Sequence, residues 1–86
     1  MARHLSLLDQ ILRGEADANI SFSEMLQLLK RFGFAERIKG THHIFYREGV
    51  DEILNLQADG NKCKPYQVKQ VRKVIIKYRL AGQADD

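Results

Sequence analysis

The feature that most restricts how this chain can fold is a pair of short β-prone runs separated by Gly40 and Thr41. The runs cover residues 35–39 and 42–47. Glycine adopts positive φ at low cost, which suits a tight reversal between two strands. We therefore expect an antiparallel hairpin whose second strand begins at His42. Side chains alternate along a strand, so His42 and the histidine after it should point to opposite faces of the sheet.

Helix signals surround this hairpin. Ser21 stands three residues before Glu24, as in a capping box, and Ile20 and Met25 occupy the positions of a hydrophobic staple. This pattern predicts a helix that continues to about residue 32 and ends before a glycine. A second apolar stripe over residues 66–78 predicts a closing helix with Pro65 at its first position. The opposite side of that helix is basic and carries Lys69, Arg72, Lys73 and Lys77.

Weaker patterns fill the remaining segments. Residues 3–13 predict a first helix, followed by a linker over residues 15–19. Residues 52–57 alternate well enough for a third strand, and residues 58–62 have the composition of a loop. Together these elements predict an α+β fold in the order α-α-β-β-β-α, with a three-stranded antiparallel sheet and helices packed on one face. We expect one domain over residues 1–86: an extra helix and linker (1–19), a core (20–80) and a tail (81–86) that is frayed from residue 83.

Charge is unevenly distributed along the 86 residues, although the net charge is only +3. Residues 62–79 contain seven bases and no acid, so a polyanion or an acidic protein surface would complement them. A solvated helix face is the structural alternative. No apolar run approaches the ~20 residues of a membrane span. Cys63 is the only cysteine, so no internal disulfide can form, and we expect a cytoplasmic protein.

The histidine pair is the strongest candidate for chemistry. Arg37, Lys39 and Arg47 lie within a few residues of His42 and His43, and an imidazole among cations suits acid–base chemistry on a phosphate backbone. The structural alternative is a partly buried histidine held by a backbone carbonyl.

At the start of the closing helix, Lys64, Tyr66 and Lys69 could attract an anion. Tyr66 could stack on a base or cover the core. Cys63 is interpreted as an incidental loop thiol. The histidines, His4 included, and this cysteine lack any metal-ligand spacing, so we expect no metal and no cofactor.

The ordered motifs resemble a known family. Gly33-Phe34 is followed by Arg37-Ile38-Lys39-Gly40-Thr41-His42-His43-Ile44-Phe45, and together they resemble the HicA toxins of bacterial type II toxin–antitoxin systems over about residues 22–80. The resemblance implies a double-stranded-RNA-binding-type domain that acts as an mRNA ribonuclease and is covered by a HicB antitoxin. It assigns catalysis to His42, with Gly40, Thr41 and His43 in support. Many members carry a proline and then a histidine at the end of the third strand, where this chain has Asn55-Leu56-Gln57-Ala58.

The sequence therefore predicts a metal-independent endoribonuclease in which His42 takes the proton from an RNA 2′-hydroxyl. Cationic side chains would stabilise the charge on the attacked phosphate. Two alternatives remain: a module that binds structured RNA without cutting it, and a basic helix that docks an acidic protein. The residues expected to contact RNA are Arg37, Lys39, Arg47, Lys64, Tyr66, Lys69, Arg72 and Lys73.

Overall fold

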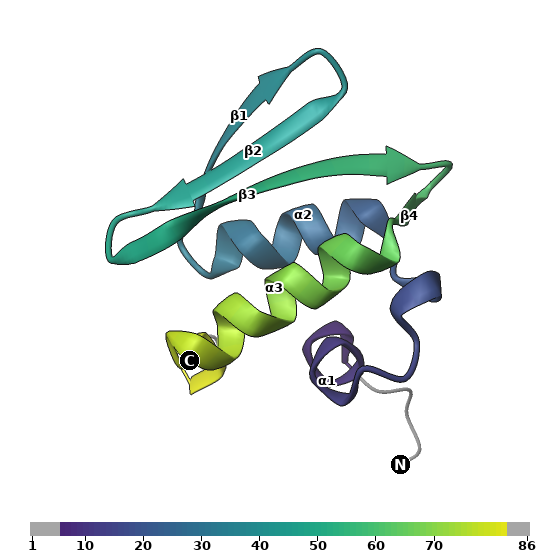
Figure 1. Ribbon diagram of the computed structural model, residues 1–86, viewed down its shortest axis with the longest axis horizontal. Coiled ribbons are helices and arrows are strands. Elements are labelled where there is room, and N and C mark those ends of the chain that lie inside the picture. Colours follow the sequence, from purple (N-terminus) through teal and green to yellow (C-terminus); the bar gives the residue numbers. More distant parts are fainter. Residues whose placement is uncertain (1–5, 83–86) are drawn as a thin grey trace.

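A computed structural model describes residues 6–82 and shows three α-helices, two short 3-10 helices and four strands within that range (Figure 1). In chain order these are α1 (Leu7–Arg13), η1 (Asp17–Asn19), α2 (Phe22–Arg31), β1 (Ala35–Lys39), β2 (His42–Arg47), β3 (Val50–Asp59), β4 (Lys62–Cys63), α3 (Pro65–Lys77) and η2 (Leu80–Gly82). None of the helices in this range is long and apolar enough to cross a membrane.

The sheet has four antiparallel strands in the order β1-β2-β3-β4, so the prediction of three strands is wrong. β3 continues to Asp59, and a two-residue turn with Gly60 at a φ of 65° returns the chain as β4. The N–H of Cys63 also donates to the carbonyl of Ile20 at 2.9 Å. β4 is therefore held from two sides, by β3 and by the segment before α2, and only the first of these partners is close in sequence.

The predicted hairpin is confirmed, with Lys39 opposite His42 and Gly40 at a φ of 62° in the connecting turn. The apolar face of the sheet carries Phe45, Leu54 and Leu56, all of which are buried. Because side chains alternate, the residues between them in sequence lie on the other face. Register places His42 beside Gln57 and Ile44 beside Asn55 on that second, open face.

α2 begins as the sequence predicts. Ser21 Oγ accepts a hydrogen bond from the backbone N–H of Glu24 at 3.3 Å, and Ile20 and Met25 are fully buried. The core-facing residues of α2 pack with the apolar stripe of α3 into one hydrophobic core, which includes Met25, Leu28, Leu29, Val68, Val71, Val74 and Ile75.

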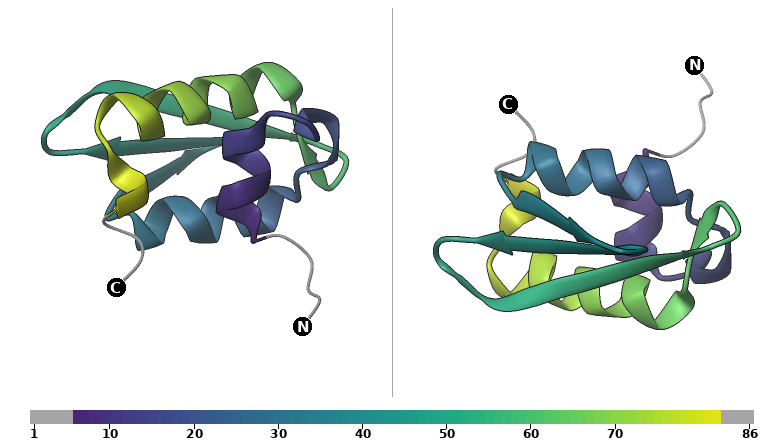
Figure 2. Two further views of the ribbon diagram at one scale, coloured as in Figure 1. Left: turned by 90° about the horizontal axis from the view of Figure 1, so that it is seen from below. Right: turned by 90° about the horizontal axis from the view of Figure 1, so that it is seen from above.

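α3 lies alongside β3, and Figure 1 and Figure 2 together show α2 and α3 on the same side of the strands, as the sequence predicts. Two polar contacts fix α3 to β3. The side-chain amide of Gln67 is buried and pairs with the backbone of Gln57. Its oxygen accepts from the Gln57 N–H at 3.0 Å, and its nitrogen donates to the Gln57 carbonyl at 3.2 Å. Near the other end of α3, the Tyr78 hydroxyl donates to Glu52 at 2.7 Å and accepts from the N–H of Asp51 at 3.1 Å.

The N-terminal segment differs from its prediction in two ways. The first helix begins at Leu7 because Ser6 is its N-cap and accepts from the N–H of Asp9 at 3.1 Å. The predicted linker contains η1, whose Asp17 is bound by an arginine of α3. Residues 3–5 of the predicted first helix and residues 83–86 of the predicted tail lie outside the described range, whereas residues 81 and 82 of that tail form part of η2.

Candidate functional site

The two histidines lie on different faces of β2, as alternation predicts, and only His42 is on the open face. Its exposed ring is held by one contact, in which Nδ1 lies 2.9 Å from Oδ1 of Asn55 on β3. With the Asn55 oxygen as acceptor, Nδ1 carries a proton, so in the neutral imidazole the lone pair lies on Nε2. Within residues 6–82 no other group hydrogen-bonds to this ring. The ring therefore has one fixed nitrogen and one nitrogen available to a ligand.

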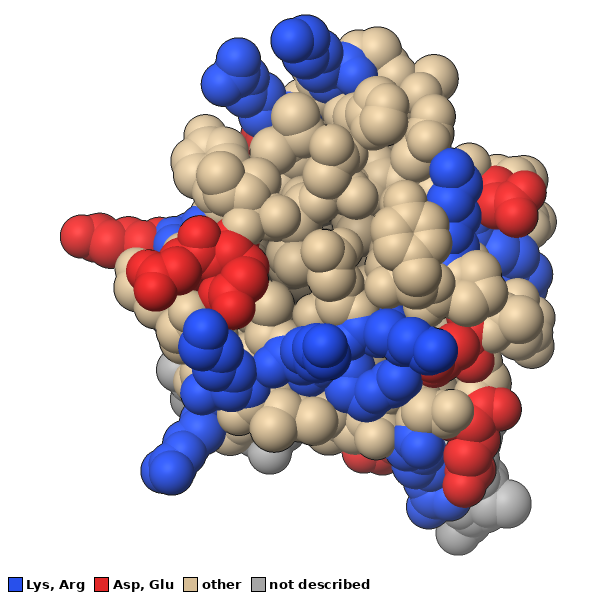
Figure 3. All heavy atoms as spheres, viewed as in Figure 1, with Lys and Arg blue, Asp and Glu red and all other residues tan. Residues whose placement is uncertain are grey.

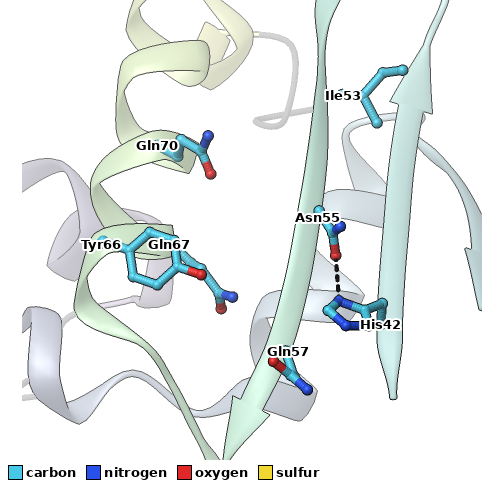
Figure 4. Close-up of a pocket in the computed structure, with 7 residues that line it drawn as sticks. All are labelled: His42, Ile53, Asn55, Gln57, Tyr66, Gln67 and Gln70. Atoms are coloured by element: carbon cyan, nitrogen blue, oxygen red, sulfur yellow. Dashed lines mark hydrogen bonds between the residues drawn. The ribbon is translucent and has the colours of Figure 1, made fainter. Parts of the chain in front are cut away.

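A hollow of about 200 Å³ opens beside His42, between the open face of the sheet and α3 (Figure 4). β3 forms one wall and the first turns of α3 form the other, and the side chains of Tyr66 and Gln70 extend from α3 toward β3. The lining consists of His42, Ile53, Asn55, Gln57, Tyr66, Gln67 and Gln70. This lining carries no formal charge other than any on the imidazole.

Cationic side chains border this uncharged hollow on two sides (Figure 3). On the hairpin, Arg37 and Lys39 are exposed on the same face as His42, and Lys39 is its direct cross-strand neighbour. A band of Lys and Arg runs along α3 on the other side of the hollow. The exposed members of α3 are Lys69, Lys73 and Lys77. An anion entering between hairpin and helix would therefore meet positive charge from two elements.

A chain of hydrogen bonds joins the hairpin turn to the start of α3. Gln57 Nε2 donates to Thr41 Oγ1 at 2.7 Å, and Gln57 Oε1 accepts from Lys64 Nζ at 3.0 Å. These bonds hold the threonine next to His42 and place a half-buried ammonium at the same end of the hollow. Thr41 and Lys64, both predicted as site residues, thus meet through a glutamine that the prediction did not include.

The side chain of His43 is held by contacts within the fold. Its Nδ1 lies 2.6 Å from Oε2 of Glu36, and its ring packs edge-on against Phe22 with 5.2 Å between centroids. Lys30 of α2 binds the other carboxylate oxygen at 2.9 Å. The hydrogen bond from His43, followed by the one from Lys30, lowers the pKa of Glu36 below its ordinary value. This cluster joins β1, β2 and α2 on the face opposite His42.

Two predicted RNA contacts lie away from the hollow. Arg47 ends β2, five residues after His42, which is roughly 17 Å along an extended strand. Arg72 binds Asp17 with both terminal nitrogens, at 2.9 and 3.1 Å, and donates to the carbonyl of Ile11. These contacts attach the N-terminal segment to α3, so we assign Arg72 a structural role.

Cys63 is a core residue and not the loop thiol that the sequence suggested. It is 2% exposed, and burial raises the pKa of its thiol to about 11, which outweighs any effect of the flanking lysines. A buried neutral thiol is a poor nucleophile. Among the described residues, no three His, Cys, Asp or Glu side chains lie close enough together to hold a metal ion.

The sequence reasoning missed the carboxamides of the site, above all Asn55. Alternation placed Asn55 and Gln57 on one face of the third strand, which was the available signal. Their relation to His42 depends on the register between β2 and β3, which the sequence did not give. Asn55 and Gln57 lie in the segment where the resembled family often carries a histidine.

Fold and site together define a small α+β domain that presents a histidine on an open sheet face bordered by cations. The chain belongs to the family of HicA toxins of bacterial toxin–antitoxin systems, because the model of that family matches residues 22–78, which is most of the chain. It is thus a toxin of the toxin–antitoxin class, and membership implies an antitoxin partner. Searches of curated proteins and of solved structures give no match.

Proposed function

We propose that this toxin is an mRNA-cleaving endoribonuclease that works without a metal ion and is neutralised by a HicB-type antitoxin. The observation that carries the proposal is the state of the His42 ring. It is exposed beside a hollow, with Nδ1 2.9 Å from the Asn55 oxygen and with no described residue hydrogen-bonded to Nε2, the nitrogen that carries the lone pair when the ring is neutral. A general base needs a positioned, unprotonated nitrogen within reach of the substrate.

In the proposed reaction, Nε2 of His42 takes the proton of an RNA 2′-hydroxyl. The 2′-oxygen attacks the adjacent phosphorus, the bond from phosphorus to the 5′-oxygen breaks, and that oxygen takes a proton from solvent. The products are a 2′,3′-cyclic phosphate and a 5′-hydroxyl. General acid–base catalysis by one side chain contributes roughly 10²–10⁴-fold. A single imidazole therefore gives a slow nuclease, which is sufficient for a toxin.

Lys39 is our first candidate for stabilising the attacked phosphate, since it is exposed and directly opposite His42 in the hairpin. Fixed positive charge near the developing negative charge lowers the barrier without a metal ion. Arg37 on the same face and Lys64 at the end of the hollow are further candidates. The exposed lysines of α3 would guide the RNA strand by their contacts with phosphates.

The basic band on α3 favours a second candidate function, in which the same domain binds RNA without cutting it. Such a module would hold RNA through phosphate contacts and would need no free imidazole nitrogen. The two functions differ in their dependence on His42, so one substitution separates them.

The test is growth inhibition by the induced toxin. We expect His42→Ala to abolish the inhibition, because the base is lost. The midpoint of thermal unfolding of this variant should stay near that of the wild type, because residue 42 is exposed. Glu48→Ala, an exposed change in the turn between β2 and β3, is the matched control and should stay toxic. A fully toxic His42→Ala protein would refute the assignment and would favour inhibition by binding alone.

A further inference from the structure

We propose that the hollow beside His42 is a nucleobase subsite, so that the substrate is an unpaired nucleotide in single-stranded RNA and not a duplex. The inference deepens the proposed function and depends on it for the reaction, although base binding can be measured separately. It is based on the side chains that line the hollow, and in particular on which of their polar groups already form hydrogen bonds within the protein.

Two side chains give the hollow apolar surfaces of the kind that hold an aromatic ring. Tyr66 on α3 is 62% exposed and Ile53 on β3 is 63% exposed, and both line the same hollow. What distinguishes these two exposed side chains is that they share one concave site with polar groups, as in the usual lining of a ligand pocket. Proteins hold unpaired bases by stacking them on aromatic rings, and Tyr66 offers its ring at the rim.

The carboxamides of the hollow divide into engaged and available groups. The amide of Gln67 is used by the backbone of Gln57, and the amide of Gln57 is used by Thr41 and Lys64. The side chain of Gln70 makes no hydrogen bond with the described residues, and the side chain of Asn55 uses only its oxygen, for His42. Gln70 therefore offers a donor and an acceptor, and Asn55 offers its NH₂ group, which together suit the hydrogen-bonding edge of a base.

The positions of these groups match the parts of one nucleotide. A base between Tyr66 and β3 would place its ribose toward His42 and its phosphate toward the exposed Lys39. In an A-form duplex the bases are stacked and paired, and the helix offers mainly its phosphates and 2′-hydroxyls. A duplex could touch the cationic borders but could not insert a base into the hollow without unpairing it.

The test measures binding of short RNA oligonucleotides to the full chain carrying His42→Ala, so that cleavage is slow on the time scale of the binding measurement. We expect tighter binding of a single strand than of the same sequence in a duplex. Replacing each nucleotide in turn by an abasic one should identify one position whose base is needed. Tyr66→Ala should weaken single-strand binding roughly 5- to 150-fold, as loss of one stacked base does. Tyr46→Ala, an exposed tyrosine outside the hollow, is the matched control.

The decisive comparison combines the two changes. If Tyr66 stacks on that base, Tyr66→Ala should have little further effect on the oligonucleotide that lacks it. Equal binding of duplex and single strand, or equal effects of Tyr66→Ala on intact and abasic RNA, would overturn the subsite. Base-dependent binding without any cleavage by the wild-type toxin would instead support the subsite and refute the nuclease. Cleavage that ignores Tyr66 and prefers duplex would support the nuclease and refute the subsite.

Discussion

Neighbouring histidines take opposite roles in this protein because strand alternation separates them. His42 is exposed on the open face and has one neutral partner, Asn55. His43 is turned toward the core, where Glu36 and Phe22 hold it. The same residue type thus supplies a candidate base on one side of the strand and a packing contact on the other.

At the residue scale we expect Asn55 to act as a positioning residue for His42. Asn55→Leu keeps the approximate size of the side chain but removes the acceptor for Nδ1. We expect kcat for RNA cleavage to fall about tenfold or more because the ring loses its orientation and tautomer. KM should change less, since the cations remain. Steady-state kinetics with a melting curve check this, and a large rise in KM with unchanged kcat would contradict it.

The sequence predicted the two faces of the strands but not the partners across them. Alternation was sufficient to place His42 and His43 on different faces of the sheet. It also placed Asn55 on the face of its strand that Leu54 and Leu56 do not occupy. The hydrogen bond between His42 and Asn55 requires a register between residues 13 apart, which local patterns do not encode. The contacts of Gln57 with Thr41 and Lys64 could not be predicted for the same reason, because they also depend on how the elements pack.

At the element scale, α2 and α3 are attached to the sheet by polar contacts at defined points. Glu36 on β1 binds Lys30 of α2 and His43 of β2, so one carboxylate joins three elements. Gln67 pairs with the backbone of β3, and Tyr78 binds Glu52 near the other end of α3. The wall of the hollow formed by α3 is therefore fixed with respect to β3.

Glu36 predicts a pH dependence of stability. Its pKa is lowered in the folded protein by His43 and Lys30, so its contribution is present above the unfolded pKa of about 4.3 and is lost as the pH falls through the lower folded value. Glu36→Gln should lower the free energy of unfolding by roughly 1 kcal/mol at pH 6. The difference between variant and wild type should shrink toward pH 3.

Urea denaturation between pH 3 and 7 measures this effect, with the exposed Glu48→Gln as the control for loss of one surface acid. A Glu36→Gln protein whose stability runs parallel to that of the wild type across the whole range would show that the cluster makes no linked contribution.

The helices were predicted well because their signals are local. Ser21 caps the second helix, and Pro65 opens the third, as the sequence indicated. β4 was missed because a strand of two residues has no periodicity of its own. It exists through pairing with Ala58 and Asp59 and through the contact with Ile20, which only the folded chain provides. The first helix begins at Leu7 because Ser6, which the periodicity had placed inside the helix, is its N-cap.

At the scale of the whole molecule, folding brings two basic segments to either side of one hollow. The hairpin cations and the α3 lysines are separated by about 30 residues in the sequence, yet Figure 3 shows them bordering the same uncharged surface. A polyanion strand laid between them would pass His42. An antitoxin that blocks this passage would need acidic side chains complementary to both borders.

The central claim is that the imidazole of His42 breaks RNA, and the most direct measurement is the chemistry of the fragment ends. Purified toxin is incubated with mRNA in EDTA, and the ends are mapped. We predict 2′,3′-cyclic phosphate and 5′-hydroxyl ends for the wild type, and a cleavage rate lower by roughly 10²–10⁴-fold for His42→Ala. The same fragments at the same rate from His42→Ala, or intact RNA with the wild type, would contradict the account.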